Sequence, residues 1–239
     1  METIEAVILA GGLGTRLRGI IGGDTPKCMA PVAGHPFLHY LLRYAAAEGV
    51  SRVVLSLGHK SEVVLDWLGT QDHPLQIDSV IEAGPLGTGG GIQLALHACR
   101  AADVVVMNGD TMFDIPLRAG LLQRHQHSGA ETTIALKTLQ NFERYGRVEK
   151  KESGVIAAFQ EKMPCPSGMI NGGVYCINRT SFLERHLPEK FSFEKDYLEH
   201  FVAEGKFYAY EGHGYFIDIG VPEDFNRAQD DFPGLFSPA

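Results

Sequence analysis

Residues 4–17 of the chain read IEAVILAGGLGTRL, an apolar run followed directly by a glycine-rich loop. The apolar run over residues 4–10 has the length and composition of a strand buried on both faces, as in a parallel sheet. Glycines at the end of such a strand let backbone N–H groups approach phosphate oxygens, and Arg16 supplies a cation there. The stretch therefore predicts an α/β protein whose sheet carries an anion-binding loop at its carboxyl edge.

Two common phosphate-binding loops do not fit this stretch. A dinucleotide-binding loop needs a glycine three residues after Gly14, where this chain has Leu17. A P-loop ends in Gly-Lys-Ser or Gly-Lys-Thr, and the sequence contains no such triplet. Taken alone, the loop fits a glycine-rich turn with a surface arginine as well as it fits a phosphate site.

Short apolar runs alternate with amphipathic stretches through the first half of the chain. Strands are predicted at 52–57, 77–82 and 104–107, and helices at 37–45, 61–68 and 89–99. This alternation indicates a parallel sheet with helices on both faces. Beyond residue 130 the strand candidates lie closer together, at 131–139, 146–150, 155–161 and 172–177. They predict a partly antiparallel extension, followed by helices at 193–204 and 222–230 with a strand at 215–219 between them.

Composition limits the classes of function. The 239 residues include 21 Lys and Arg against 29 Asp and Glu, for a formal charge of −8. This charge argues against an unspecific nucleic-acid or anionic-membrane binder, but not against a small anionic substrate. Hydrophobic residues make up 44% of the chain, enough for a core, and no apolar run reaches the roughly 18 residues of a membrane span.

The amino terminus and the cysteines indicate a cytoplasmic protein. The first five residues include two glutamates and do not read as a signal peptide. The four cysteines form no Cys-x-x-Cys pair and are sparse, so they are interpreted as reduced thiols. They stand at Cys28, Cys99, Cys165 and Cys176.

A second motif follows the glycine loop, and residues 24–36 read DTPKCMAPVAGHP. Pro26 fixes the backbone before Lys27 and is expected to direct the ammonium group back toward the loop. Together, the strand, the loop and this motif resemble the sugar-1-phosphate nucleotidyltransferase family. The signature of that family is a strand, a Gly-x-Gly-Thr-Arg-Leu loop, Pro-Lys and a Pro-x-x-Gly-x-Pro segment.

Five further segments extend the resemblance along almost the whole chain. They are PLGTGG at 85–90, NGD at 108–110, FQEK at 159–162, NGGVY at 171–175 and FIDIGVPED at 216–224. The resemblance implies a Rossmann-like three-layer α/β/α fold with a mixed, mostly parallel sheet and a small antiparallel extension. It also implies one domain over residues 1–239, with a nucleotide-binding half at about 1–110 and a sugar-phosphate-binding half at about 111–239.

The family reaction joins a nucleoside triphosphate to a sugar 1-phosphate and releases pyrophosphate, with Mg²⁺ as cofactor. The resemblance implies four catalytic residues, namely Arg16, Lys27, Asp110 and Lys162. It implies a nucleotide site built from Leu9, Ala10, Gly11, Gly12, Gly14, Thr15, Arg16, Lys27, Glu82, Pro85, Leu86, Gly87, Thr88 and Asp110. It implies a sugar-phosphate site of Glu161, Lys162, Asn171 and Gly172, and magnesium ligands at Asp110 and Asp218. Both reactants are anions, which accounts for the cations, and Mg²⁺ takes hard oxygen ligands such as carboxylates.

Most of these side chains also have a purely structural interpretation. Asp110 after a strand fits a helix cap or a turn, Lys162 fits a solvated surface, and Asn171 fits a turn. His125 and His127 have the spacing of a metal pair but are interpreted as a solvated face at a polar helix end.

The nucleobase is predicted from Glu82, just before the second glycine segment. A carboxylate only accepts hydrogen bonds, and guanine presents two adjacent donors, so a Glu82 that reaches the base favours GTP. Four stretches resemble the branch of the family that couples GTP to D-glycero-α-D-manno-heptose 1-phosphate, which implies GDP-heptose for surface glycans. They are LGTRLR at 13–18, PKCMAPV at 26–32, LSLGHKSE at 55–62 and FSFEKD at 191–196. UTP, dTTP or CTP, and GTP with mannose 1-phosphate, stay open as alternatives.

Three other classes are weighed against this interpretation. A non-catalytic paralogue is expected to lose the Arg, Lys or Asp residues named above. A glycosyltransferase of similar fold needs an Asp-x-Asp motif, which the NGDT segment at 108–111 lacks. A cytidylyltransferase acting on phosphocholine shares the loop. The partners expected are small molecules, with neither nucleic acid nor a membrane, and a homo-oligomer is left open.

Overall fold

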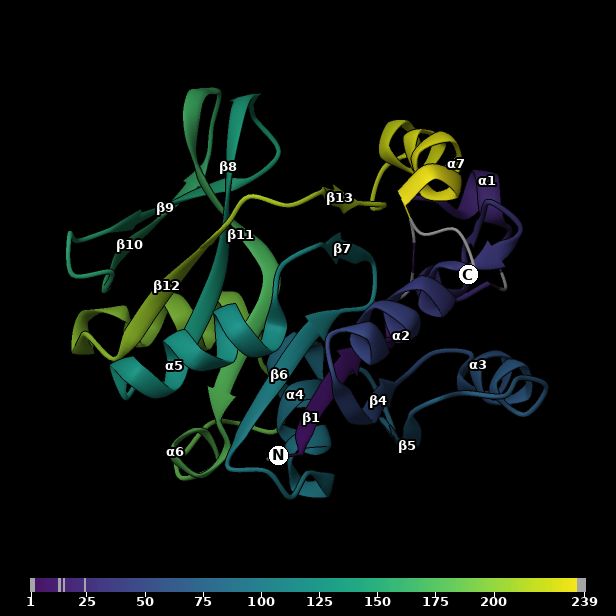
Figure 1. Ribbon diagram of the computed structural model, residues 1–239, viewed down its shortest axis with the longest axis horizontal. Helices are drawn as coiled ribbons and strands as arrows, with labels where there is room; N and C mark the ends of the chain where they lie inside the picture. The colour runs from purple at the N-terminus through teal and green to yellow at the C-terminus, as the bar shows by residue number, and fades with distance from the viewer. Residues whose placement is uncertain (1–2, 13, 15, 24, 236–239) are drawn as a thin grey trace.

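The computed structural model describes residues 3–12, 14, 16–23 and 25–235, and its centre is a nine-stranded sheet (Figure 1). Four parallel strands form one part of this sheet, in the order β5, β4, β1, β6. They span β1 (Ile4–Leu9), β4 (Val50–Leu57), β5 (Gln76–Ile81) and β6 (Asp103–Asn108). The predicted α/β class with a mostly parallel sheet is confirmed.

Alternation along β1 places apolar side chains on both faces of the sheet. Ala6 and Ile8 belong to the core beneath helix α2 (Phe37–Ala47), whereas Val7 belongs to the core beneath helix α4 (Gly87–Ala98). The two helices therefore cover opposite faces, and β1 is buried between them (Figure 1). This burial explains why the strand reads as a continuous apolar run.

The second half of the chain extends the same sheet with antiparallel strands. β11 (Cys165–Asn178) pairs with β6 on one side and with β8 (Thr132–Phe142) on the other. The remaining strands of the sheet are β9 (Gly146–Lys150), β10 (Ile156–Lys162) and β12 (Phe207–Gly212). A second, two-stranded sheet pairs β7 (Thr111–Phe113) with β13 (Phe216–Asp218), and a third pairs β2 (Pro31–Val32) with β3 (His35–Pro36).

The remaining helical segments are short except at the carboxyl end. The α-helices are α1 (Arg18–Ile21), α3 (Ser61–Leu68), α5 (Gln123–Ser128), α6 (Arg179–Leu183) and α7 (Pro222–Leu235). The 3-10 helices are η1 (Lys27–Met29) and η4 (Val202–Glu204), and the wider π-helical segments are η2 (Leu117–Leu122) and η3 (Phe193–Glu199). Among the described residues, no helix is long and apolar enough to cross a membrane.

Two sequence-based expectations are wrong in detail. Helix α7 continues past residue 230 because Phe232 is buried and packs its ring against Phe37 and Tyr40. His125 is not on a solvated face: its ring is buried, with Nδ1 3.0 Å from the Thr133 hydroxyl and Nε2 3.3 Å from an Asp103 carboxylate oxygen.

A buried ion pair fixes the amino-terminal ends of the parallel strands. Arg52 on β4 donates from Nη1 to Glu5 Oε1 at 2.6 Å and from Nε to Asp78 Oδ2 at 2.7 Å. Glu5 Oε2 accepts the backbone N–H groups of Arg100 at 2.5 Å and Ala101 at 2.7 Å. Burial alone raises the pKa of Glu5, but these N–H groups and the guanidinium outweigh it, so that its pKa falls below the usual value.

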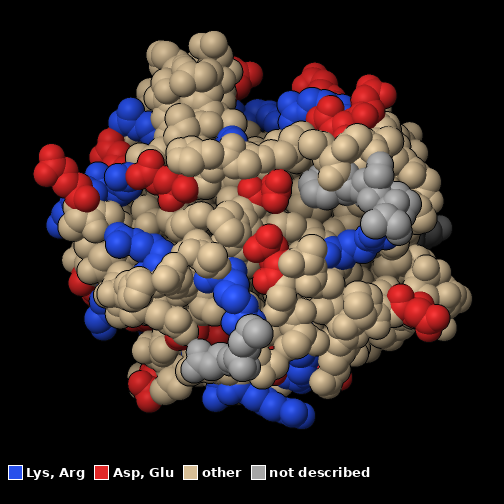
Figure 2. All heavy atoms as spheres, viewed as in Figure 1, with Lys and Arg blue, Asp and Glu red and all other residues tan. Residues whose placement is uncertain are grey.

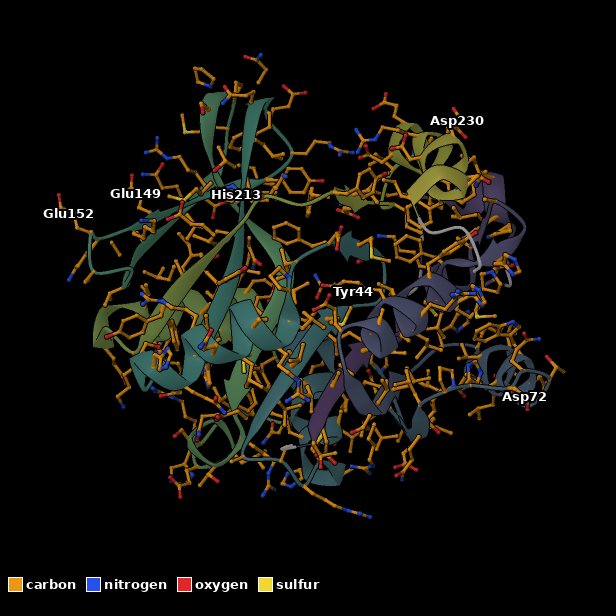
Figure 3. All side chains as sticks on the ribbon, in the orientation of Figure 1. Tyr44, Asp72, Glu149, Glu152, His213 and Asp230 are labelled. Carbon is orange, nitrogen blue, oxygen red and sulfur yellow. The ribbon has the colours of Figure 1, made fainter. Side chains whose placement is uncertain are left out.

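Replacing Glu5 with glutamine should lower the free energy of unfolding by about 3 kcal/mol at pH 7, because it removes one partner of a buried ion pair. The contribution of Glu5 to the free energy of unfolding is fully present at pH values above the ordinary glutamate pKa of about 4.3. It is lost as the pH falls through the lower pKa that Glu5 has in the folded state. Urea denaturation at a series of pH values should show that the difference in free energy of unfolding between wild type and Glu5→Gln becomes smaller in acid. Glu152→Gln is the control, because Glu152 is exposed between β9 and β10 (Figure 3). A gap that stays constant down to pH 3 would contradict this account.

Candidate functional site

A cavity of about 650 Å³ opens at the carboxyl ends of the parallel strands. Its wall includes eleven of the predicted nucleotide-site residues, namely Leu9, Ala10, Gly11, Gly12, Gly14, Lys27, Glu82, Pro85, Gly87, Thr88 and Asp110. These residues come from four separate segments, and the sheet brings them together because parallel strands end at one edge. Segments distant in sequence thus form one continuous concave surface.

The glycine loop after β1 leaves room for the Lys27 side chain. Gly14 has a φ of +57°, a left-handed conformation that side chains disfavour, and a Cβ there would lie 3.3 Å from Lys27 Cβ. Lys27 begins the short helix η1, directly after Pro26 with its φ of −58°. The lysine stem therefore packs against the loop and carries its ammonium group toward Asp110.

Three charged side chains meet at one point beside the cavity. Lys27 Nζ forms an ion pair with Asp110 Oδ2 and lies 3.6 Å from Asp218 Oδ1. Asp110 directly precedes β7 and Asp218 ends β13, and the pairing of those two strands places both carboxylates near the same ammonium group. The backbone also joins these ends, because the Ile219 N–H donates to the Asp110 carbonyl at 3.0 Å.

This carboxylate pair fits a magnesium ion bound together with a phosphate substrate. Burial raises the pKa of Asp218, the Asp110 carboxylate raises it further, and the Lys27 ammonium opposes both. A divalent cation would relieve this repulsion, and Mg²⁺ is commonly held by one or two carboxylates plus substrate phosphates. Among the described residues, no group of three or more His, Cys, Asp and Glu side chains could hold a metal ion by itself. The remaining ligands would therefore come from phosphate and water.

Glu82 lies in the cavity wall with both carboxylate oxygens already in contact with protein donors. Oε2 accepts the Leu86 N–H at 3.0 Å, and Oε1 lies 3.5 Å from the Ser56 hydroxyl. Each carboxylate oxygen has two lone pairs, so Glu82 retains capacity to accept from a ligand. The position of this side chain is thus set by the protein before any ligand binds.

Cys28 lines the cavity, although the sequence analysis did not assign it to the site. Burial, with a further contribution from Asp110, raises the pKa of this thiol to about 12. A thiol with that pKa carries almost no thiolate at neutral pH and is a poor nucleophile. The chemistry of this cavity therefore does not depend on a covalent cysteine intermediate.

Several predicted site residues lie outside the wall of this cavity. Arg16 is exposed after the glycine loop, and Thr15 lies outside the described residues. Leu86 contributes its N–H to Glu82 but does not line the cavity. Glu161 and Lys162 are exposed at the end of β10, where Lys162 pairs with Gly146 of β9.

The predicted sugar-phosphate residues on β11 lie next to a residue of the cavity wall. Asn171 donates from Nδ2 to the Tyr175 hydroxyl at 2.9 Å and accepts the Gly173 N–H at 3.0 Å. Asn108, which lines the cavity, packs against Gly173 so closely that a Cβ there would lie 2.8 Å from Asn108 Nδ2. Gly172 is buried where a Cβ would collide with the ring of Phe113. Asn171 is therefore held in a turn and at the same time linked to the cavity wall.

Two further residues of the wall, Gly58 and His59, were not assigned to the site from the sequence. They follow β4, and Gly58 lies so close to the glycine loop that a Cβ on it would be 3.2 Å from the Gly11 carbonyl oxygen. The signal that could have found them is positional, since they follow a predicted parallel strand at the ligand-binding edge.

Charge on the surface shown in Figure 2 is mixed. Acidic and basic side chains are interspersed over this face, and no continuous basic stripe runs across the residues that are drawn in colour. This distribution agrees with a site that binds a small anion through a few nearby cations and not through a continuous basic surface.

The chain belongs to the nucleotidyl transferase family, whose model matches residues 5–233. It is 46% identical, over 95% of its length and 97% of the relative, to D-glycero-alpha-D-manno-heptose 1-phosphate guanylyltransferase of Aneurinibacillus thermoaerophilus. It is 40% identical to the protein of the same description from Campylobacter jejuni, over 93% of this chain and 97% of that one. Its fold matches the crystal structure of HddC from Yersinia pseudotuberculosis complexed with GMP-PN. The TM-score is 0.84 at 34% identity, over 96% of this chain and all of that one.

Replacing Asp218 with asparagine should leave the fold intact and cut turnover a hundredfold or more, on the order of 3 kcal/mol of activation free energy. The change removes one of the two carboxylates that face Lys27, which are the two predicted ligands for a metal. Asp230→Asn is the matched control, because Asp230 is exposed on α7 (Figure 3). Pyrophosphate release measures turnover, and a soluble Asp218→Asn protein with near-normal turnover would contradict the assignment.

Proposed function

We propose that this chain transfers GMP from GTP to D-glycero-α-D-manno-heptose 1-phosphate, giving GDP-heptose and pyrophosphate for surface glycan synthesis. The similarity to heptose 1-phosphate guanylyltransferases over nearly the full length of both chains carries the proposal. The cavity supports it, because a glycine loop, one lysine and two aspartates meet where a nucleotide and its metal would bind.

The reaction requires no covalent enzyme intermediate. An oxygen of the sugar 1-phosphate forms a bond to the α-phosphorus of GTP, and the bond from that phosphorus to the bridging oxygen breaks. The electron pair leaves with pyrophosphate. The two substrates repel each other, so the main task of the protein is to position them and to stabilise the developing negative charge.

Each charged residue of the site has a definable part in this reaction. The Lys27 ammonium lies beside the cavity and neutralises phosphate oxygens there, while Asp110 and Asp218 supply the hard ligands for Mg²⁺. When bound, Mg²⁺ would neutralise charge on the phosphate oxygens. The family resemblance assigns Arg16 to the triphosphate and Lys162 to the sugar phosphate, and both side chains are exposed.

Purified protein should use GTP at least tenfold better than UTP, measured as kcat/KM for pyrophosphate release. Glu82→Gln should reduce this preference by roughly 1–3 kcal/mol, because the glutamine amide presents one acceptor and one donor to the two donors of guanine. Glu62→Gln makes the same chemical change at an exposed position of α3 and should leave the preference unchanged. If the unmutated protein uses UTP as well as GTP, guanine selection by Glu82 is wrong, although nucleotidyl transfer stands.

Substitutions of Arg16 and Lys162, the two cations outside the cavity wall, should affect different kinetic constants. Lys162→Ala should mainly raise the KM for the sugar phosphate, because its ammonium is assigned to that substrate, whereas Arg16→Ala should mainly lower kcat. Lys151→Ala, at an exposed position between β9 and β10, serves as the control for removing a surface lysine. If Arg16→Ala raised only the KM for the sugar phosphate, Arg16 would belong to the sugar-phosphate site and not to the triphosphate site.

The same assay distinguishes the alternatives that the sequence leaves open. GTP, UTP, dTTP and CTP are each tested with heptose 1-phosphate and with mannose 1-phosphate. Comparable use of mannose 1-phosphate would broaden the sugar assignment. If none of the tested pairs of nucleotide and sugar phosphate gave pyrophosphate, the chain would be a non-catalytic paralogue.

A further inference from the structure

Residues 189–196, here called the bracing segment, lie against the first turn of α4 at the cavity wall. The Gly89 N–H donates to the Phe191 carbonyl, and the Phe191 N–H donates to the Leu86 carbonyl, both at 3.0 Å. The helix begins after Leu86, whose side chain provides no hydrogen bond to the helix start. The bracing segment, about 100 residues farther along the chain, therefore accepts one of the N–H groups at the start of α4, where no local side chain caps the helix.

Close packing accounts for the two glycines at positions 89 and 90 of this turn. A Cβ on Gly89 would lie within 3 Å of three atoms of the Phe191 ring, and a Cβ on Gly90 would collide with the Glu189 carbonyl oxygen. Any side chain at either position would push the bracing segment away from α4. Two glycines of the PLGTGG motif are thus explained by this contact and not by contact with a ligand.

Thr88 connects the bracing segment directly to the cavity. Its hydroxyl donates to Glu194 Oε2 at 2.7 Å and accepts the Phe193 N–H at 2.9 Å. Glu194 Oε2 also accepts the Ser192 hydroxyl at 3.0 Å, which fixes the carboxylate on its own segment. Thr88 lines the cavity, so Glu194, together with the Phe193 N–H, orients this part of the wall.

We propose that Glu194 is a positioning residue of the nucleotide site, which acts through the Thr88 hydroxyl to hold the first turn of α4 in place. The inference rests on the proposed function, because it assumes that the cavity takes GTP. Glu194 touches the wall and not the substrate. Its loss should weaken nucleotide binding with little direct effect on the chemical step, since a displaced wall misaligns the groups that hold the ligand.

The Glu194→Ala variant should raise the KM for GTP and the Kd for a non-hydrolysable GTP analogue about tenfold. Its kcat and its KM for the sugar phosphate should stay within about twofold of wild type. Glu194→Gln keeps an oxygen that can accept from Thr88 and should restore most of the affinity. Thr88→Val removes this hydrogen bond and the one from the Phe193 N–H, so it should raise the Kd at least as much as Glu194→Ala. The double variant should be no worse than Thr88→Val alone, because Glu194 acts through the hydroxyl that Thr88→Val has already removed.

Asp196→Ala is the matched control within the bracing segment. Asp196 is exposed, and among the described residues its side chain accepts the Ser192 N–H alone, at 2.7 Å, so its loss should lower thermal stability without changing the Kd for the analogue. Equal Kd values for wild type and Glu194→Ala, or effects of Glu194 and Thr88 that add, would overturn the positioning role. A wild-type protein that binds the analogue but turns over no GTP would overturn only the proposed function. One that does not bind the analogue would overturn both.

Discussion

Strand β1 is hydrogen-bonded in parallel on both sides, and the whole cavity depends on that pairing. Leu9 lies level with Ser56 of β4 and with Asn108 of β6, so the segments that follow these strands begin at the same height. Leu57 is likewise level with Ile81, which brings Glu82 to the same edge. A shift of one residue in any of these registers would exchange the side chains that pack under α2 with those that pack under α4, and it would separate the glycine loop from the residues that complete its wall.

The parallel half could be predicted from the sequence because its signals are local. Buried strands such as β1 and β6 read as short apolar runs, and glycines mark their ends. Local sequence patterns predict the strands of the antiparallel half less well. β11 begins at Cys165, seven residues before its predicted start at residue 172. The prediction missed the start of the strand because residues 166–168 read Pro-Ser-Gly, which is typical of a turn. Pairing with β8 holds them in the sheet, and no local pattern reveals such a partner.

The functional site likewise has parts that could be predicted from the sequence and parts that could not. The rule that ligands bind beyond the carboxyl ends of parallel strands was enough to place Asp110 beside the glycine loop. Arrangements made by distant contacts were not predictable: the burial of His125 depends on Asp103 and Thr133, and the fixed orientation of Thr88 depends on Glu194. Glu161 and Lys162 were assigned through family resemblance, and their exposed positions on β10 leave that assignment to experiment.

The antiparallel placement of β11 has a consequence for the order in which the chain is synthesised. β6 is complete at residue 108, yet the strand that covers its outer edge begins only at residue 165. A nascent chain that has reached residue 110 therefore carries four parallel strands with the apolar Val104–Met107 edge unpaired, a template for strands of other chains. The halves on either side of residue 110 are consequently poor candidates for separate expression, since each would expose a sheet edge that the other half covers.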